Sequence, residues 1–462
     1  MSSHQAPLTP TDSERMAEFA LQLDLDAIPA DVQMLAKEHL LDVLGIALAS
    51  SSFEFGRVAV EGVRALGNGN EATVLGSGER LPATSAALAN GILAHSLDFD
   101  DTHIGAIYHA SAPALAAALA AGQANGASGR EVLTAFIIAL EIGCRLGTGA
   151  AGKLHGRGFH PTALCGTFAA AAAAGRLSKV SQPALVSALG LCGSMAAGIL
   201  EVGQSWLKRL HPGWAAHGGL SSVALARVGF LGPNTVFEGG HGFYATHVQA
   251  VPSGEQSPAH GLGDSWQTLG IALKPYPCCH FIHGFVDAAL QLRGQFELGE
   301  IERIDCPLTA MIHPLVGAPR ERCIRPPTIY AALFSVNYVV ALALLKGRVD
   351  LAAFYDEPID DPEVLALAAK VYCVDDPASD FPKHFPGEVI VTLRDGRVLR
   401  YRQPTSLGTP EVPLSREQIE AKFYANATRA ISREAAEQVV QQVYQLEQAK
   451  SLDALMALTR RQ

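Results

Sequence analysis

The sequence predicts a mainly α-helical protein, with a large helical-bundle domain and a smaller α+β domain. Apolar residues recur at helical spacing through most of residues 11–265, and strand-like alternation begins only after about residue 268. Helical spacing returns from Ser415 onward. Because 462 residues exceed what one core usually holds, we expect two domains. We place the main domain at residues 1–268, completed by 410–462, and the smaller domain at 269–409.

The first predicted helix starts at Thr11, whose side chain can form a capping box with Glu14, and it ends near Leu23. Many of the following segments are rich in Ala and Gly, which let helices approach closely. We expect helices over 31–50, 84–102, 112–124, 130–147, 162–177, 183–195 and 219–232.

The smaller domain is expected to combine strands with helices. Residues 301–312 alternate as a strand does, and 362–371 have the spacing of a short helix. Residues 387–402 read as two strands joined at Asp395-Gly396, a pair typical of hairpin turns. Helical spacing over 416–427, 433–448 and 452–461 indicates that the chain rejoins the main domain.

Composition excludes several classes of partner. The net charge is −10 and no Lys/Arg run occurs, so nucleic acid and anionic membranes are not expected partners. The N-terminal stretch is polar and does not have the pattern of a secretory signal, and Glu141 interrupts the most apolar helix. We therefore expect a cytoplasmic protein. The eight scattered cysteines indicate free thiols in the core.

The stretch LAHSLDFDDTH, residues 93–103, concentrates titratable groups after an apolar run. On a helix over 84–102, Asp98 and Thr102 lie four residues apart and would project together. The glycine and glutamate that an EF-hand loop requires are missing, which argues against calcium. A plain alternative is a solvated helix end with an ordinary, partly buried His95.

Two further motifs each combine an imidazole with an expected helix N-terminus. His160 precedes Pro161, a residue suited to the first turn of a helix, so the imidazole should sit at a positive helix end. Lys208 and His211 are expected in a turn before a helix that starts near Pro212. The plain alternatives are a simple helix cap and a solvated basic pair.

In the smaller domain, Lys274 lies in a segment that two prolines hold extended, and a helix is expected to open near Cys279 or His280. A zinc site is not expected here, because no second Cys/His pair stands at ligand spacing. Ser335 and Tyr338 are expected on an otherwise apolar helix, where an ordinary core tyrosine is the plain alternative. Nucleotide-binding motifs are missing from the sequence.

Taken in order, AHSLDFDDTH, GFHPTALCGTF, LKRLHPGWAAHGG, LKPYPCCHF and FSVNY resemble the MmgE/PrpD family, whose members include dehydratases, decarboxylases and epimerases of small carboxylic acids. The resemblance covers nearly the whole chain. It implies a helical main domain, a smaller α+β lid, a cleft between them, a homodimer, and catalysis without metal or organic cofactor.

Carried over by motif, the resemblance implies seven catalytic residues. These are Asp98, Thr102, His109, His160, Lys208, Lys274 and Tyr338. It also implies that Lys208, Lys274, Cys279, His280 and His211 contact the substrate. Cys279 stands where the decarboxylases have histidine, and the loop before His109 is one residue longer than theirs, which argues against decarboxylation.

The expected reaction is therefore dehydration of a small di- or tricarboxylic acid. A base removes a proton next to a carboxylate, fixed positive charge stabilises the resulting anion, and a hydroxyl group leaves. His160, or Asp98 paired with His109, is the candidate base, and the other imidazole or Tyr338 is the candidate acid for the leaving oxygen. The sequence does not order these roles. The alternatives are an epimerase, racemase or decarboxylase on the same scaffold, and a helical scaffold without catalysis.

Overall fold

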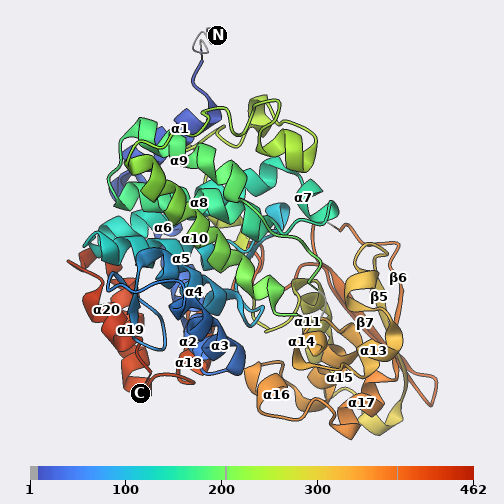
Figure 1. The fold of residues 1–462 in the computed structure, drawn as a ribbon. Helices are drawn as coiled ribbons and strands as arrows, with labels where there is room; N and C mark the ends of the chain where they lie inside the picture. The colour runs from blue at the N-terminus through green and yellow to red at the C-terminus, as the bar shows by residue number, and fades with distance from the viewer. Residues whose placement is uncertain (1–8, 203–204, 382, 462) are drawn as a thin grey trace. The chain divides into compact units, whose positions relative to one another are not determined.

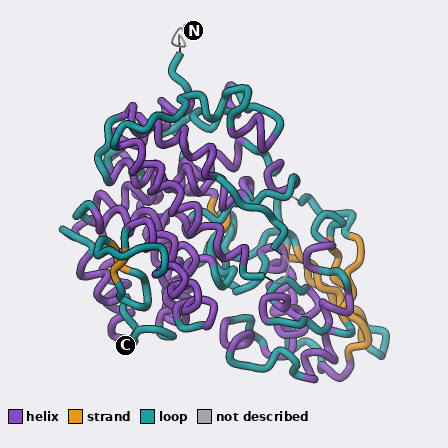
Figure 2. The backbone as a smooth tube through the Cα atoms, viewed as in Figure 1, coloured by secondary structure: helices purple, strands orange, loops and turns teal. Residues whose placement is uncertain are grey.

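The computed structural model describes residues 9–202, 205–381 and 383–461. The chain divides into two compact units: one comprises the residues up to Ser96 together with 100–271 and 415–462, and the other comprises 97–99 and 272–414. Helices dominate the first unit, and the four-stranded sheet belongs to the second (Figure 2). The predicted fold class, mainly α with a smaller α+β part, is confirmed.

The first unit is built from helices that follow the predicted periodicity. Helix α1 (Asp12–Gln22) starts at the expected capping box of Thr11 and Glu14. The other helices are α2 (Ala30–Ser51), α3 (Glu54–Arg64), α4 (Ala83–His95), α5 (Ser111–Ala124), α6 (Gly129–Gly149), α7 (Lys153–Gly156), α8 (Pro161–Leu177), α9 (Gln182–Met195), α10 (Leu207–Arg227), α18 (Arg416–Ala427), α19 (Arg433–Tyr444) and α20 (Asp453–Leu458). Its short strands are β1 (Ala72–Thr73), paired with β2 (Arg80–Leu81), and β3 (Thr102–His103). Strand β4 (Ile271–Ala272) spans the sequence boundary between the two units.

Helix α10 packs on α8 and on α4 in the middle of this unit (Figure 1). The approach to α4 requires glycine, because a Cβ on Gly91 would lie 2.5 Å from the Cα of Gly213. This contact brings the C-terminal end of α4 and the N-terminal half of α10 together.

Helices α5 and α6 are apolar on nearly all sides, and nearly all of their residues are buried. Among the described residues, α6 is also the one helix long and apolar enough to cross a membrane by composition, but 89% of that window is buried inside the protein. The bent pair α2 and α3 passes the same test only when taken as one span.

The second unit contains a sheet in the order β6-β5-β7-β8. Strand β5 (Ile301–Leu308) runs parallel to β6 (Val371–Asp375) and antiparallel to β7 (Gly387–Leu393), which forms the predicted hairpin with β8 (Val398–Gln403). Gly396 adopts the positive φ of 87° that the turn requires. The helices are α11 (His283–Leu292), α12 (His313–Val316), α13 (Arg320–Ile324), α14 (Ile329–Ala332), α15 (Val336–Lys346), α16 (Leu351–Tyr355) and α17 (Pro362–Ala368).

Several predicted helix boundaries are wrong. The helix expected over 84–102 ends at His95, because Asp98 takes a left-handed conformation with φ 51°, which no helix continues through. Asp98 and Thr102 therefore do not share a helix face, and Thr102 lies in β3. The helix expected near Pro212 starts five residues earlier at Leu207, so Lys208 and His211 are helical.

Ser335 precedes α15 instead of lying on it, and its side chain caps the helix by accepting from the Tyr338 backbone N–H. Residues 219–227 belong to α10, which ends at Arg227, so the helix expected over 219–232 is the second half of a longer one.

Candidate active site

Three buried histidines from separate segments of the first unit meet at one place. His95 ends α4, His109 lies shortly before α5, and His160 precedes α8. One ring nitrogen from each lies within 4.8 Å of the others. The ring centroids of His95 and His109 are 4.7 Å apart, and both rings lie within 5.8 Å of His160. We call these three residues the imidazole cluster.

His95 is paired with Asp100 across the end of α4. Its Nδ1 lies 2.8 Å from each carboxylate oxygen, and Asp100 is fully buried. The same carboxylate lies 3.8 Å from Nδ1 of His109. A buried carboxylate bonded to Nδ1 fixes the imidazole and stabilises the positive charge that the ring gains when it accepts a proton. Sequence analysis did not include His95 and Asp100 among the candidate site residues.

Asp101 anchors the loop that carries His109. Its carboxylate pairs with His39 of α2 at 2.7 Å and accepts hydrogen bonds from the backbone N–H and the hydroxyl of Ser111. Burial alone would raise the pKa of Asp101, but the hydrogen bonds from His39 and Ser111 hold that pKa below its usual value.

Hydrogen bonds hold both the ring and the backbone of His109. Its Nδ1 donates to the carbonyl of Asp101 at 2.8 Å and lies 3.3 Å from the Thr102 hydroxyl. Its backbone N–H donates to the Thr162 hydroxyl of α8 at 3.1 Å. Because a carbonyl only accepts, the proton of the neutral His109 ring belongs on Nδ1.

His160 occupies the predicted place before α8, in extended geometry. Burial lowers the pKa of His160 well below its usual value, and the positive charge of Lys208 and the neighbouring imidazoles lower it further. At neutral pH the ring is therefore uncharged. It stands at a helix N-terminus, where backbone N–H groups favour an anion.

His211 contacts His160. The two Nδ1 atoms are 2.8 Å apart, and both side chains are buried. Burial, with the charges of His95 and Lys208, lowers the pKa of His211 to about 4. Lys208, one helical turn before His211, is partly exposed at the start of α10. The structure therefore brings Lys208 and His211 of α10 close to His160, and both lie on a helix and not in the turn that was expected.

Asp98 and Lys274 form a buried pair in the second unit. The Lys274 ammonium donates to the backbone carbonyl of Asp98 at 2.8 Å and lies 3.4 Å from its carboxylate. The side chains are 3% and 1% exposed. His280 belongs to the same unit; burial and the Lys274 charge lower its pKa to about 3, against the opposing effect of Asp98. Cys279 lies beside it at the start of the short helical turn over 280–282, and its backbone N–H donates to the Leu333 carbonyl at 2.9 Å.

Tyr338 lies on α15, and its described surroundings differ from those of Lys274. Its ring is 6.3 Å from that of Phe354. Burial and the negative charges of Asp361 and Glu357 raise the pKa of Tyr338 to about 12. A tyrosine with neighbouring carboxylates keeps its proton at neutral pH.

Apart from Cys279 and Tyr338, the predicted site residues form two groups. The first unit brings together Thr102, His109, His160, His211 and Lys208. The second unit brings together Asp98, Lys274 and His280. That all of them serve one substrate stays a prediction.

The imidazole cluster also has the composition of a metal site. Three imidazoles supply nitrogen ligands of the kind that zinc binds. Each Nδ1 has a partner, as is usual for ligating histidines: Asp100 for His95, the Asp101 carbonyl for His109 and His211 for His160. Sequence analysis weighed zinc only at the cysteines and histidines of 278–283.

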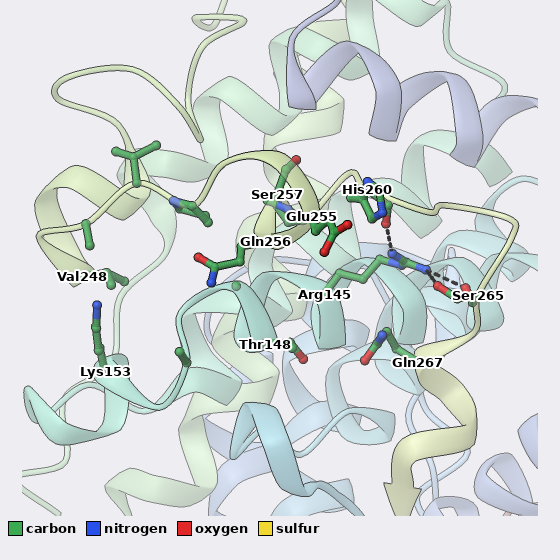
Figure 3. A pocket seen from close by; sticks show the side chains of 16 residues that line it. Arg145, Thr148, Lys153, Val248, Glu255, Gln256, Ser257, His260, Ser265 and Gln267 are labelled. Carbon is green, nitrogen blue, oxygen red and sulfur yellow. Dashed lines mark hydrogen bonds between the residues drawn. The ribbon is translucent and has the colours of Figure 1, made fainter.

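A separate hollow of about 470 Å³ lies in the first unit, beside the C-terminal end of α6 (Figure 3). Arg145, Lys153 and Glu255 are among its lining residues, which include none of the predicted site residues. The Arg145 guanidinium donates to the carbonyls of Gly261 at 2.9 Å and Ser265 at 2.6 Å, so it fastens the loop over 260–265 to α6. This hollow contributes nothing to the imidazole cluster.

All eight cysteines are free thiols, as predicted. Burial raises the pKa of Cys278 well above its usual value, so this thiol is not ionised at neutral pH. Cys278 therefore lacks the properties of an activated nucleophile.

A helical unit with buried, hydrogen-bonded imidazoles at its helix ends has the features of an enzyme that moves protons. Comparison with known proteins identifies the family. The MmgE/PrpD N-terminal domain matches residues 14–255 and the MmgE/PrpD C-terminal domain matches 276–446. The chain belongs to the MmgE/PrpD family, as the resemblance of its motifs implied.

Named relatives carry two activities. The chain is 30% identical to cis-aconitate decarboxylase of Homo sapiens, over 92% of this chain and 89% of the relative. It is 27% identical to cis-aconitate decarboxylase of Aspergillus terreus, over 96% and 95%. It is also 27% identical to 2-methylcitrate dehydratase of Cupriavidus necator, over 79% of each.

Proposed function

We propose that the protein is a lyase that dehydrates a small di- or tricarboxylic acid by removing a proton from the carbon next to a carboxylate. The observation that supports this most is the imidazole cluster with its two differently paired rings. His95 is paired with a carboxylate, and His160 with a second imidazole. Dehydration requires both a base for carbon and an acid for the departing hydroxyl, and two such groups meet that requirement.

The electrostatics of the first unit suit the anion that the reaction creates. Proton removal next to a carboxylate adds negative charge to a group that is already anionic. Lys208 and the N-terminus of α8 supply fixed positive potential beside His160. His160, with His211 at its Nδ1, and His95, with Asp100 at its Nδ1, are the two groups that can exchange a proton with the substrate.

Decarboxylation is the second candidate, because several named relatives, among them the human protein, are cis-aconitate decarboxylases. That reaction breaks a carbon–carboxylate bond and needs one proton donor for carbon. The two candidates therefore differ in their product: water in one case, carbon dioxide in the other.

NMR of the purified protein with a panel of carboxylic acids tests the proposal. The panel includes 2-methylcitrate, cis-aconitate and related hydroxy acids. We expect an alkene product from a hydroxy acid, and at least a hundredfold loss in His160→Asn. The matched control is His217→Asn on α10, which removes a histidine outside the cluster and should keep wild-type turnover.

Release of carbon dioxide from cis-aconitate without any dehydration would replace the proposal with the decarboxylase. Inversion at carbon without loss of water would indicate an epimerase. No turnover of any acid, together with wild-type thermal stability in His160→Asn, would support the non-catalytic scaffold.

We further propose that the protein works in the cytoplasm as a homodimer and without a metal. Sedimentation of the purified protein tests the dimer. Activity that disappears with a chelator and returns with zinc would contradict the proposal that the protein works without a metal.

A further inference from the structure

The bond between His160 and His211 restricts where the protons of the two rings can lie. The Nδ1 atoms are 2.8 Å apart, and the side chains are 2% and 3% exposed. A hydrogen bond between two nitrogens holds one proton, so one Nδ1 donates and the other accepts.

Two neutral rings joined in this way must be opposite tautomers. When His160 carries its proton on Nδ1, its Nε2 is a base and His211 carries its proton on Nε2. When His211 carries its proton on Nδ1, His160 carries its own on Nε2 and that atom is a donor. Both rings are neutral at neutral pH, since their pKa values are lowered by burial and by Lys208.

We propose that His211 is a positioning residue that determines which ring nitrogen of His160 carries the proton, and thereby whether His160 Nε2 accepts or donates one. The inference rests on the proposed function and adds a residue to it. Sequence analysis assigned His211 to substrate contact, whereas the structure places its Nδ1 against an imidazole.

The surrounding backbone fixes both rings. The His160 backbone N–H donates to the carbonyl of Gly198 at 3.0 Å. A Cβ on Gly198 would lie 2.3 Å from the Cβ of Ala163 and 3.5 Å from Nε2 of His211. Only glycine allows the chain to pass this close to both helices, so the pair is held by α8, α10 and the segment between them.

The step that His211 supports balances as follows. With Nδ1–H of His160 donated to Nδ1 of His211, Nε2 of His160 takes the substrate proton, and the electron pair of the C–H bond stays on carbon. His160 is then an imidazolium, and its Nδ1–H donates a stronger hydrogen bond to Nδ1 of His211 than the neutral ring does. The electron pair on carbon then forms the C=C bond as the C–O bond breaks. The departing hydroxyl takes the C–O electron pair, accepts the Nε2 proton of His160 and leaves as water.

Steady-state kinetics of three variants test the inference. His211→Leu removes the acceptor, and we expect kcat to fall on the order of a hundredfold while KM stays within about threefold, the usual range for disabling a general base. His211→Asn keeps a polar atom near the position of Nδ1 and should recover at least a tenth of kcat. His211→Asp adds a negative charge, and should move the acidic limb of kcat/KM upward by about 1 to 3 pH units.

Wild-type kcat and an unchanged pH profile in His211→Leu would overturn the inference. An equal loss of kcat in His211→Leu and His211→Asn, with an unchanged pH profile of kcat/KM in His211→Asp, would also overturn it, because that result indicates a purely structural role. Thermal unfolding, with His217→Asn as the control on the same helix, verifies that each variant is folded.

A second measurement separates this inference from the proposed function. Nitrogen NMR of the ¹⁵N-histidine protein, assigned with His160→Asn and His211→Asn, reports the tautomer of each ring without any substrate. Opposite tautomers are expected, and the same tautomer in both rings would refute the inference even in an active enzyme. Opposite tautomers in a protein that converts no acid would uphold the inference about the pair and refute the proposed function.

Discussion

Replacing Lys274 by methionine tests whether the buried pair with Asp98 is ionic. The ammonium lies 3.4 Å from the carboxylate, and both side chains are at most 3% exposed. At an effective dielectric constant of about 20, Coulomb's law gives an attraction of about 5 kcal/mol at this distance. Desolvation offsets part of that gain, and loss of one partner leaves a buried charge, which typically costs about 3 to 5 kcal/mol. We expect Lys274→Met to lower the free energy of unfolding by this amount.

Urea unfolding of a double-mutant cycle measures the effect. The single variants are Lys274→Met and Asp98→Asn, and the double variant removes both charges. We expect each single variant to be destabilised and the double variant to recover much of the loss, because the orphaned charge is gone. A loss below about 1 kcal/mol in Lys274→Met with no coupling would refute the description of the pair as a buried ionic interaction.

Three further results are expected. Burial raises the pKa of Asp42 from 3.8 to about 6. A raised carboxyl pKa stabilises the fold below the unfolded pKa, so the free energy of unfolding relative to Asp42→Asn should fall by about 2 kcal/mol from pH 4 to 6 in urea unfolding, and a constant difference would contradict it. Asp100→Asn should lower kcat by at least about a hundredfold in the NMR assay, run at a temperature where thermal unfolding shows the variant to be folded, since a neutral amide cannot stabilise charge on its imidazole partner. Near-normal turnover would remove Asp100 from the site. Gly91→Ala should lower the free energy of unfolding by about 1 to 3 kcal/mol, because the added Cβ forces α4 away from Gly213. In the control Gly62→Ala in α3, the added Cβ meets nothing within 4 Å, so stability should be unchanged or higher. Equal effects of the two substitutions on the melting temperature would contradict this packing.

The sequence was sufficient where the deciding interactions are local. Periodicity located the helices, the Thr11 capping box marked the start of α1, and Pro161 placed His160 before α8. The Asp395-Gly396 hairpin followed from the turn that this pair favours. These features depend on a few neighbouring residues, which the sequence displays directly.

The end of α4 could not be predicted in the same way. Helical spacing continues to Thr102, but the chain leaves the helix after His95 so that Asp100 can turn back to the imidazole. Aspartate tolerates the left-handed conformation that Asp98 adopts, but the spacing of apolar residues does not show which residue adopts it. The five-residue separation of His95 and Asp100 across a helix end was the one available signal.

The partner of His211 was also beyond the sequence. His160 and His211 are 51 residues apart, and only the packing of α8 on α10 brings them into contact. Pro212 suggested a helix start, yet the helix begins at Leu207 and carries the proline inside it. The same shift turned Lys208 from a loop residue into a helical one.

Exchange of carbon-bound hydrogen in deuterated water shows whether the imidazole cluster removes a proton next to a carboxylate. We expect the substrate acid to gain deuterium at that carbon in the wild type, and the exchange to fall with turnover in His160→Asn. Turnover of the acid by wild type without any carbon–hydrogen exchange into product or recovered substrate, or exchange that His160→Asn leaves untouched, would contradict it.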